Sequence, residues 1–356
     1  MTAPTVRQFG RTAGRFTARL THRLSTPLLP EDYLSLLNPL WSVHDLCGRV
    51  EAVMPETADT ATLVIKPGRA WDPRAAKAGQ WLRIGVDVDG VRRWRTFSMS
   101  RLPQSDGRFA ITVKAGPEGV VSKHLVHRTK PGAIVRLGRP EGEFVLPDHP
   151  VRPLFVTAGS GITPVMAMLR DPGRNADDIV LIHSARTPED VIFGDELRRS
   201  GVRLIERHTG AAGRLRPAEL DDLCPDWRTR PTWACGPTGL LDSLVEHWEA
   251  AGETAGLHVE RFQTPALVTG GEGGKACFTR SGRTVEAPGD QPLLEVGEEA
   301  GVLMPSGCRM GICFTCVARL GAGQVRDLRT GTVHGEEGEL VQTCISAAAG
   351  PVDIDL

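Results

Sequence analysis

The chain has no run of about 18 consecutive apolar residues, roughly the shortest helix that can span a bilayer. It also lacks the apolar core of a signal peptide near its first residue, and neither end has a lipidation motif. Its formal net charge is only −1, which argues against nucleic acid as the main partner. Eight cysteines without a disulfide-like spacing suit a reducing compartment. We therefore expect a cytoplasmic protein, and a length of 356 residues suggests two or three domains.

The most specific motif is a group of cysteines near the C-terminal end. Cys308, Cys313 and Cys316 follow the spacing C-x4-C-x2-C, and Cys344 lies further along the chain. This spacing is the plant-type [2Fe–2S] pattern, and Gly311 suits a loop that must approach inorganic sulfide closely. A zinc site usually has two C-x2-C pairs, a dithiol redox pair would leave two cysteines unexplained, and the loop has no His for a Rieske cluster. We therefore predict that these four cysteines bind a [2Fe–2S] cluster.

Local patterns divide the chain into segments of different character. Between about residues 61 and 114, short β-type runs alternate with Gly, Pro and Asp, which indicates a small antiparallel barrel. From about residue 153, apolar strands alternate with helices, which is typical of a parallel sheet. We therefore expect a multidomain protein with an N-terminal extension over 1–45, an antiparallel β-barrel over 46–150, an α/β domain over 151–265, a Gly-rich linker over 266–275 and an α+β domain of the β-grasp type over 276–356.

The N-terminal extension begins with a basic, amphipathic pattern. Arginines recur every four residues from Arg7 to Arg23, and apolar residues follow steps of three and four along one stripe. Such a helix over residues 1–25 is typical of peripheral contact with a membrane or of docking to a partner. Gly10 and Gly14 weaken the helix, and the alternative is that its apolar stripe packs on the parent domain.

Two short motifs in the predicted barrel suit a phosphate group. Arg95-Thr-Phe-Ser98 lies at a strand end, and Arg95 offers a fixed, positively charged fork. Residues 119–122, Gly-Val-Val-Ser, open a predicted helix, whose free backbone N–H groups attract anions. Each motif is weak alone, and Arg95 could instead form a salt bridge at the strand edge.

A glycine-rich turn follows the first strand of the predicted α/β domain. Gly159-Ser-Gly161-Ile-Thr-Pro164 joins the strand to a helix, the order required for a pyrophosphate to approach a helix N-terminus. Further on, Cys235-Gly-Pro237 ends another strand. On the residues alone, Cys235 reads as a buried thiol at a strand end.

Together, the order of these pieces resembles the ferredoxin–NADP reductase-like superfamily, joined to a C-terminal plant-type ferredoxin domain. The resemblance implies that the barrel binds FAD, with FMN as the alternative, and that Ser98 lies near flavin N5. It also implies that residues 119–122 hold the flavin diphosphate. Phe97 stands where the family usually has Tyr, so a stacking surface is kept but a hydroxyl is lost.

The same resemblance places the pyridine nucleotide at the glycine-rich turn, with Cys235 beside the nicotinamide. Ser184 and Arg186 follow the second strand without a nearby carboxylate, which favours NADPH over NADH. Glu260 and Phe262 match the family's last strand, where Glu260 would tune the flavin or relay a proton; the alternative is an ordinary surface ion pair.

The resemblance thus implies a full set of site residues. Ser98, Cys235 and Glu260 would shape the reaction site. The cofactor-binding residues would be Arg95, Thr96, Phe97, Ser98, Lys114, Gly119, Val120, Val121, Ser122, Gly159, Ser160, Gly161, Thr163, Pro164, Ser184, Arg186, Cys235, Gly236, Pro237 and Phe262.

A narrower resemblance concerns the function. Residues 24–41 look like those of actinobacterial reductases that serve membrane fatty-acyl desaturases. We therefore expect electrons to pass from NADPH through FAD and the cluster to a membrane di-iron acyl desaturase, with residues 1–25 contacting the inner face of the membrane. One alternative acceptor is a haem or Rieske-type oxygenase. An alternative from a different functional class is a flavin/iron–sulfur redox sensor or carrier without NADPH turnover.

Overall fold

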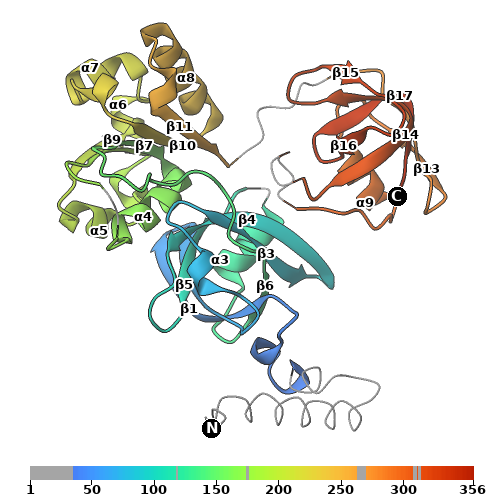
Figure 1. Cartoon of the computed structure of the whole chain (residues 1–356), viewed down its shortest axis with the longest axis horizontal. Coiled ribbons are helices and arrows are strands. Elements are labelled where there is room, and N and C mark those ends of the chain that lie inside the picture. The colour runs from blue at the N-terminus through green and yellow to red at the C-terminus, as the bar shows by residue number, and fades with distance from the viewer. Residues whose placement is uncertain (1–34, 118, 174–175, 263–269, 308–310, 312–313) are drawn as a thin grey trace, which may run out of the picture.

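The computed structural model describes residues 35–117, 119–173, 176–262, 270–307, 311 and 314–356 (Figure 1). Three β-sheets organise this part of the chain: a closed barrel, a parallel sheet and a mixed sheet. The predicted basic helix over residues 1–25 lies outside the described residues. None of the helices that the structure describes is long and apolar enough to cross a bilayer.

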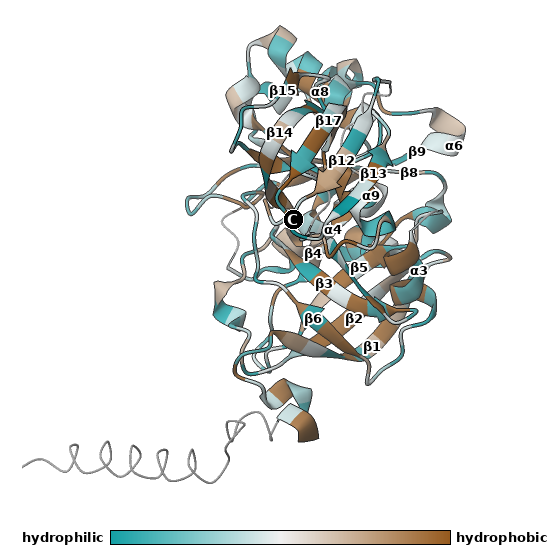
Figure 2. Ribbon diagram, turned by 90° about the vertical axis from the view of Figure 1, so that its right-hand side faces the viewer, coloured by the Kyte–Doolittle hydropathy of each residue, from teal (hydrophilic) through white to brown (hydrophobic). Residues whose placement is uncertain are grey.

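The barrel follows the predicted short β-type runs. Its strands are β1 (Cys47–Thr57), β2 (Thr60–Pro67), β3 (Trp81–Val88), β4 (Val91–Arg101), β5 (Phe109–Lys114) and β6 (Ile134–Leu137), closed in the order β1-β2-β5-β4-β3-β6. All neighbouring strands are antiparallel. Because side chains alternate across a strand, Leu82 and Ile84 of β3 point inward and are fully buried with Leu63 and Ile111. Figure 2 shows the resulting apolar residues along the barrel strands. The prediction of an antiparallel barrel is confirmed.

The second sheet is parallel, as the alternation of strands and helices predicts. Its strands are β7 (Leu154–Ala158), β8 (Val180–Ala185), β9 (Arg203–His208), β10 (Thr232–Gly236) and β11 (Leu257–Arg261), in the order β11-β10-β7-β8-β9. Helices cover both faces: α4 (Ile162–Arg170), α5 (Gly194–Arg199), α6 (Thr209–Ala212), α7 (Leu220–Leu223) and α8 (Thr238–Ala251) (Figure 1).

The strand order places a crevice at a defined point of this sheet. The chain runs outward from β7 to β8 on one side and later returns to β10 on the other. In open α/β sheets, ligands bind at the carboxyl ends of the strands where the order reverses in this way. That point lies between the ends of β7 and β10, where Gly161 and Cys235 stand.

The third sheet is mixed and carries one helix. It contains β12 (Gly274–Phe278), β13 (Arg283–Ala287), β14 (Val317–Asp327), β15 (Val333–His334) and β17 (Ser346–Ile354) in the order β13-β12-β17-β14-β15, with β16 (Leu340–Gln342) paired to β14. Helix α9 (Leu293–Glu299) packs Leu293, Leu294 and Val296 into the core of this sheet. The α+β prediction is confirmed. β12 begins at Gly274, inside the range expected to be linker, and residues 263–269 of the connection lie outside the described part.

Candidate flavin and iron–sulfur sites

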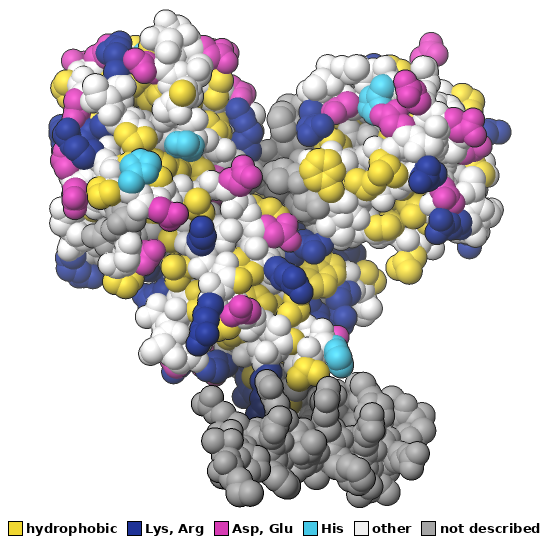
Figure 3. Space-filling model, in the orientation of Figure 1, with side chains coloured by type: hydrophobic (Ala, Val, Ile, Leu, Met, Phe, Trp, Pro, Cys, Tyr) yellow, Lys and Arg dark blue, Asp and Glu magenta, His cyan; other side chains and the backbone are white. Residues whose placement is uncertain are grey.

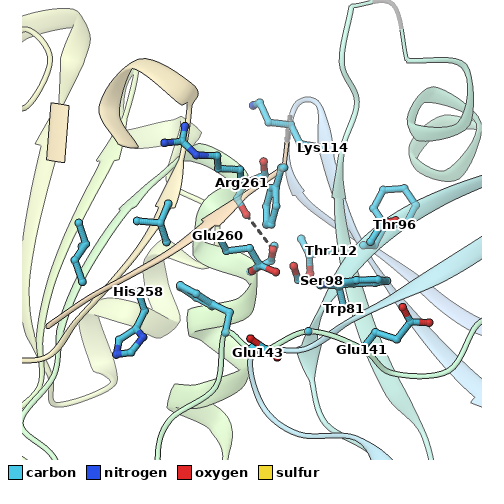
Figure 4. Close-up of a pocket in the computed structure, with 18 residues that line it drawn as sticks. Trp81, Thr96, Ser98, Thr112, Lys114, Glu141, Glu143, His258, Glu260 and Arg261 are labelled. Carbon is cyan, nitrogen blue, oxygen red and sulfur yellow. Dashed lines mark hydrogen bonds between the residues drawn. The ribbon is translucent and has the colours of Figure 1, made fainter. Parts of the chain in front are cut away.

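A cavity of about 860 Å³ lies between the barrel and the parallel sheet (Figure 4). Its volume is within the range of cofactor sites. The barrel contributes side chains from β3, β4 and β5, and the parallel sheet contributes β11 and the turn after β7. The lining residues are Trp81, Thr96, Phe97, Ser98, Thr112, Lys114, Glu141, Gly142, Glu143, Phe144, Ser160, Thr163, Leu257, His258, Val259, Glu260, Arg261 and Phe262.

Unpaired polar atoms face this cavity. Ser98 Oγ, Thr96 Oγ1 and Glu260 Oε2 are buried, and none has a hydrogen-bond partner among the described residues. Figure 4 shows Glu260 reaching from β11 toward Ser98 on β4. Buried polar groups in native proteins are almost always hydrogen-bonded, so orphaned atoms beside a cavity indicate a ligand with matching donors and acceptors.

Aromatic side chains supply the apolar part of the lining. Trp81, Phe97, Phe144 and Phe262 all border the cavity. The glycine at position 142 makes room for Trp81, because a Cβ there would lie 2.9 Å from the indole Nε1. Apolar rings around a few convergent polar atoms fit a flat, hydrogen-bonding ring system such as a flavin. The residues present therefore fit the cofactor that the barrel motifs predict.

The predicted phosphate-binding pieces lie at the rim of the barrel. Gly119 caps α3 (Val120–His127), and a Cβ there would lie 2.1 Å from Ser122 Oγ. The Ser122 hydroxyl donates to the Gly119 carbonyl at 3.2 Å and accepts from Gly116 N–H at 3.3 Å, which fixes the turn before the helix. Val121 is buried in the barrel core, whereas Val120 is exposed.

Two cationic residues predicted to bind the cofactor have protein partners. Lys114 lines the cavity and forms an ion pair with Asp59, with Nζ and Oδ2 2.7 Å apart. Arg95 is half-buried on β4 and donates to the Trp94 carbonyl at 2.8 Å. Both side chains are thus held in place by the barrel itself.

The glycine-rich turn packs tightly against the end of β10. A Cβ on Gly161 would lie 2.1 Å from the Cys235 carbonyl oxygen and 2.8 Å from Gly236 N, so glycine is required there. Gly159 has a φ of +54°, which glycine adopts without strain. Ser160 and Thr163 line the cavity, and the Thr163 hydroxyl donates to the Ser160 carbonyl at 3.0 Å. Pro164 is buried in the first turn of α4, where its missing N–H costs nothing.

Cys235 lies at the end of β10, immediately before Gly236 and Pro237, which caps α8. Its side chain is fully buried and does not border the cavity. Burial raises the pKa of the thiol well above its usual value, and the nearby Glu260 carboxylate adds to this effect. Cys235 therefore remains a neutral thiol at the crevice between β7 and β10.

Glu260 lies opposite Cys235 in the pairing of β10 with β11. Burial raises the pKa of its carboxyl group to about 8, because no charge compensates the lost hydration. Part of the residue is accessible through the cavity, but Oε2 itself is enclosed. The interpretation of Glu260 as a surface ion pair is therefore not what the structure shows.

This burial predicts a pH-dependent stability. Between pH 4.5 and 8 the unfolded chain ionises Glu260 while the folded protein keeps it protonated, so the free energy of unfolding falls as pH rises. We compare the flavin-free forms of Glu260→Gln and wild type. The free energy of unfolding of the variant relative to wild type should rise by roughly 2 kcal/mol between pH 5 and pH 8, after allowance for the partial exposure of Glu260. Thermal unfolding midpoints across this range measure the difference. Parallel curves for the two proteins would contradict the assignment.

The residues predicted to select the nucleotide lie at the end of β8. Ser184 is buried, and its Oγ has no hydrogen-bond partner among the described residues. Arg186 is exposed in the loop that follows, where its carbonyl accepts from Gly210 N–H at 2.9 Å. Neither residue borders the cavity, and both lie at the carboxyl end of β8.

The structure brings together the two predicted cluster ligands that it describes. The Sγ atoms of Cys316 and Cys344 are 3.1 Å apart and buried. Thr343 secures this arrangement by donating through its backbone N–H and its hydroxyl to the Cys316 carbonyl, at 3.2 and 2.9 Å. Gly311 has a φ of +72°, and its carbonyl accepts from Gln342 at 3.0 Å. Cys308 and Cys313 lie outside the described residues.

Sequence reasoning missed about half of the cavity lining. Trp81 stands opposite Ser98 in the β3–β4 register, so correct strand pairing would have pointed to it. Thr112 lies two residues before Lys114 on the same face of β5. Glu141 and Phe144 belong to an irregular segment after β6 that carries no motif, and nothing local marks it as a cofactor site.

Two family models match the chain. An oxidoreductase FAD-binding domain matches residues 49–146, which form the barrel and the segment after it. A 2Fe-2S iron–sulfur cluster binding domain matches residues 278–349, which include all four predicted ligands. These matches agree with the cavity beside Ser98 and with the pair Cys316 and Cys344.

Known proteins resemble the chain over most of its length. It is 49% identical to an NADPH oxidoreductase of Mycobacterium tuberculosis, with 99% of this chain and 96% of the relative covered. A glycine betaine monooxygenase reductase subunit of Pseudomonas aeruginosa is 30% identical, over 78% of this chain and 87% of the relative. The solved structure of phthalate dioxygenase reductase covers 88% of this chain and 98% of its own, with 26% identity and a TM-score of 0.61. The chain therefore belongs to the family of ferredoxin-reductase-type oxidoreductases that join an FAD-binding domain to a 2Fe-2S domain.

Proposed function

We propose that this protein is an NADPH-dependent reductase that passes electrons through FAD and a [2Fe–2S] cluster to an oxygen-activating protein. The observation that carries the proposal is the cavity in which Ser98 of the barrel, Glu260 of β11 and the turn after β7 converge. The relative named NADPH oxidoreductase and the relative named as a monooxygenase reductase subunit support the two ends of this electron path.

The bound flavin would take a hydride from NADPH and release electrons singly to the cluster, which is chemistry that the cofactors supply. The chain's own residues position and tune this exchange. The Ser98 hydroxyl is free to hydrogen-bond a ring nitrogen, and Phe97 offers a flat surface for stacking. Burial raises the pKa of Glu260 to about 8, so its carboxyl group keeps a proton within the same cavity and can serve as a proton donor.

The preference for NADPH rests on Ser184 and Arg186. Arg186→Ala should raise the KM for NADPH by roughly 10- to 100-fold, because one charge-assisted contact to the 2′-phosphate is lost, while the KM for NADH stays the same. Steady-state ferricyanide reduction with each nucleotide measures this. The control is Arg199→Ala, which removes an exposed arginine at the end of α5. It should change the KM for neither nucleotide. A parallel rise for both nucleotides would contradict a role in 2′-phosphate recognition.

For the acceptor, we propose a membrane di-iron acyl desaturase. The described part of the N-terminal region exposes Leu36, Leu37, Trp41 and Val43, with 77% and 78% of the two leucines accessible. An exposed apolar group that follows the predicted basic helix in the sequence suits peripheral contact with a membrane. We therefore propose that the protein lies at the periphery of the inner face of the membrane.

Reconstitution tests the acceptor. Purified protein and NADPH are added to membranes of a source strain that lacks the protein, and conversion of stearoyl-CoA to its mono-unsaturated product is followed. NADPH-dependent product is the expected result. No product, with cytochrome c still reduced, would reject the desaturase and favour a haem or Rieske-type oxygenase. Failure to reduce cytochrome c and ferricyanide would instead favour a redox sensor or carrier.

A further inference from the structure

One side-chain contact joins the barrel to the loop of the cluster. Arg83 on β3 donates through a terminal guanidinium nitrogen to Thr315 Oγ1 at 3.0 Å. Thr315 immediately precedes Cys316, whose sulfur is beside that of Cys344. The two residues are 232 positions apart in sequence, so the contact depends on how the two domains meet.

The barrel holds Arg83 firmly. Its carbonyl accepts from Gly138 N–H at 2.7 Å, and a Cβ on Gly138 would lie 3.1 Å from the Arg83 Cβ, so the backbone of β3 is closely covered. The guanidinium carbon lies 6.0 Å from the centre of a Trp94 ring. Arg83 Nε is buried without a partner among the described residues. A partly desolvated cation of this kind makes a stronger and more directional hydrogen bond than an exposed one.

A second, smaller hollow borders Arg83. Its volume is about 370 Å³, and its lining residues are Leu46, Arg83, Trp94, Leu137, Gly138, Arg139, Glu141 and Ser306. Ser306 comes from the segment that leads to Cys308, so both flanks of the cluster loop face the barrel here. Figure 3 shows Lys and Arg side chains gathered on the barrel where it approaches the C-terminal domain.

The hollow and the flavin cavity share Glu141 in their linings. The backbone of Glu141 pairs with Trp81, with N–O distances of 2.8 and 3.0 Å. Trp81 lines the flavin cavity, and Arg83 lies two residues further on the same face of β3. A short, packed stretch of β3 therefore separates the flavin cavity from the cluster loop.

We propose that Arg83 is the positioning residue that holds the cluster loop against the flavin barrel through Thr315. This inference rests on the proposed function. The step it serves moves one electron, so that the flavin is oxidised by one electron as the cluster is reduced by one, and no protein bond forms or breaks. Arg83 acts by fixing the distance and orientation across which this electron moves.

Variants of both partners test the inference. Arg83→Met removes the donor but keeps the length of the side chain, and Thr315→Val removes the hydroxyl without changing charge or shape. Each should lower NADPH-driven cytochrome c reduction at least roughly tenfold, while ferricyanide reduction and the visible absorption of the cluster persist. The double variant should lose no more than either single variant, and Arg83→Lys should restore part of the rate.

A readout independent of turnover is amide hydrogen exchange of residues 314–320 in the loaded protein. Exchange there should rise in both variants and stay unchanged in Arg136→Met, a control on neighbouring β6 whose side chain pairs with Asp45 at 3.0 Å. Unchanged exchange and unchanged cytochrome c reduction in an active protein would overturn the inference. So would loss of cluster absorption in both variants, since Arg83 would then support the cluster itself. A wild-type protein unable to reduce cytochrome c would instead refute the proposed function.

Discussion

Cys344→Ser is expected to lose the visible absorption of the cluster and to reduce cytochrome c at least roughly 100-fold more slowly. Replacing residues that merely support a metal ligand lowers metal affinity or activity by about 10- to 100-fold. Cys344 is predicted to be a ligand itself, so the loss should be at least as large. Its sulfur lies 3.1 Å from that of Cys316, in a buried position that a hydroxyl cannot use equally well. Ferricyanide reduction should survive, because it draws electrons from the flavin.

The same domain offers a matched control. Cys277 lies on β12, is half-buried and stands outside the predicted ligand pattern. Cys277→Ser should keep the cluster and both activities. Equal loss of cytochrome c and ferricyanide reduction in Cys344→Ser would contradict an electron path in which the flavin precedes the cluster.

Gly161→Ala is expected to abolish NADPH oxidation almost completely. The added Cβ would lie 2.1 Å from the Cys235 carbonyl oxygen, and neither atom belongs to a flexible side chain. The turn after β7 must therefore move away from β10, which displaces the N-terminus of α4 from any bound pyrophosphate. A displacement of about 1 Å can cost roughly 100-fold in rate. Stopped-flow reduction of the flavin by NADPH measures the loss.

The rest of the protein should remain intact in this variant. Dithionite should still reduce flavin and cluster, and both absorption spectra should match those of wild type. Gly239→Ala, near the start of α8, is the control, because no atom lies within 4 Å of its added Cβ. It should leave activity unchanged and stabilise the helix slightly. Normal flavin reduction in Gly161→Ala would show that the turn does not bind the nucleotide.

Local sequence signals account for most of the fold. The short β-type runs separated by Gly, Pro and Asp predicted the barrel, since each strand carries its own pattern. The turn from β7 into α4 was also predictable, because strand, glycine turn and helix follow one another directly in the chain and Gly159 has a positive φ. These features depend on residues near one another in the chain.

The rest of the site arises only from tertiary packing. Phe144 reaches the flavin cavity from a segment without a motif, and Trp81 does so because β3 pairs with β4. The sequence does not distinguish between two roles for Glu260, a surface ion pair and a residue of the flavin cavity. Only the enclosure of its carboxylate between β11 and the barrel distinguishes the two, and enclosure depends on residues more than 100 positions away.

The position of β17 has a consequence for biosynthesis. This strand lies between β12 and β14 at the centre of the third sheet, although its residues are the last of the sheet to leave the ribosome. The barrel can fold while translation continues, but the C-terminal sheet cannot close until Ile354 has emerged. Iron and sulfide must therefore be delivered after β17 has been synthesised, and a chain that ends within the nine residues of β17 would be a flavoprotein without its cluster.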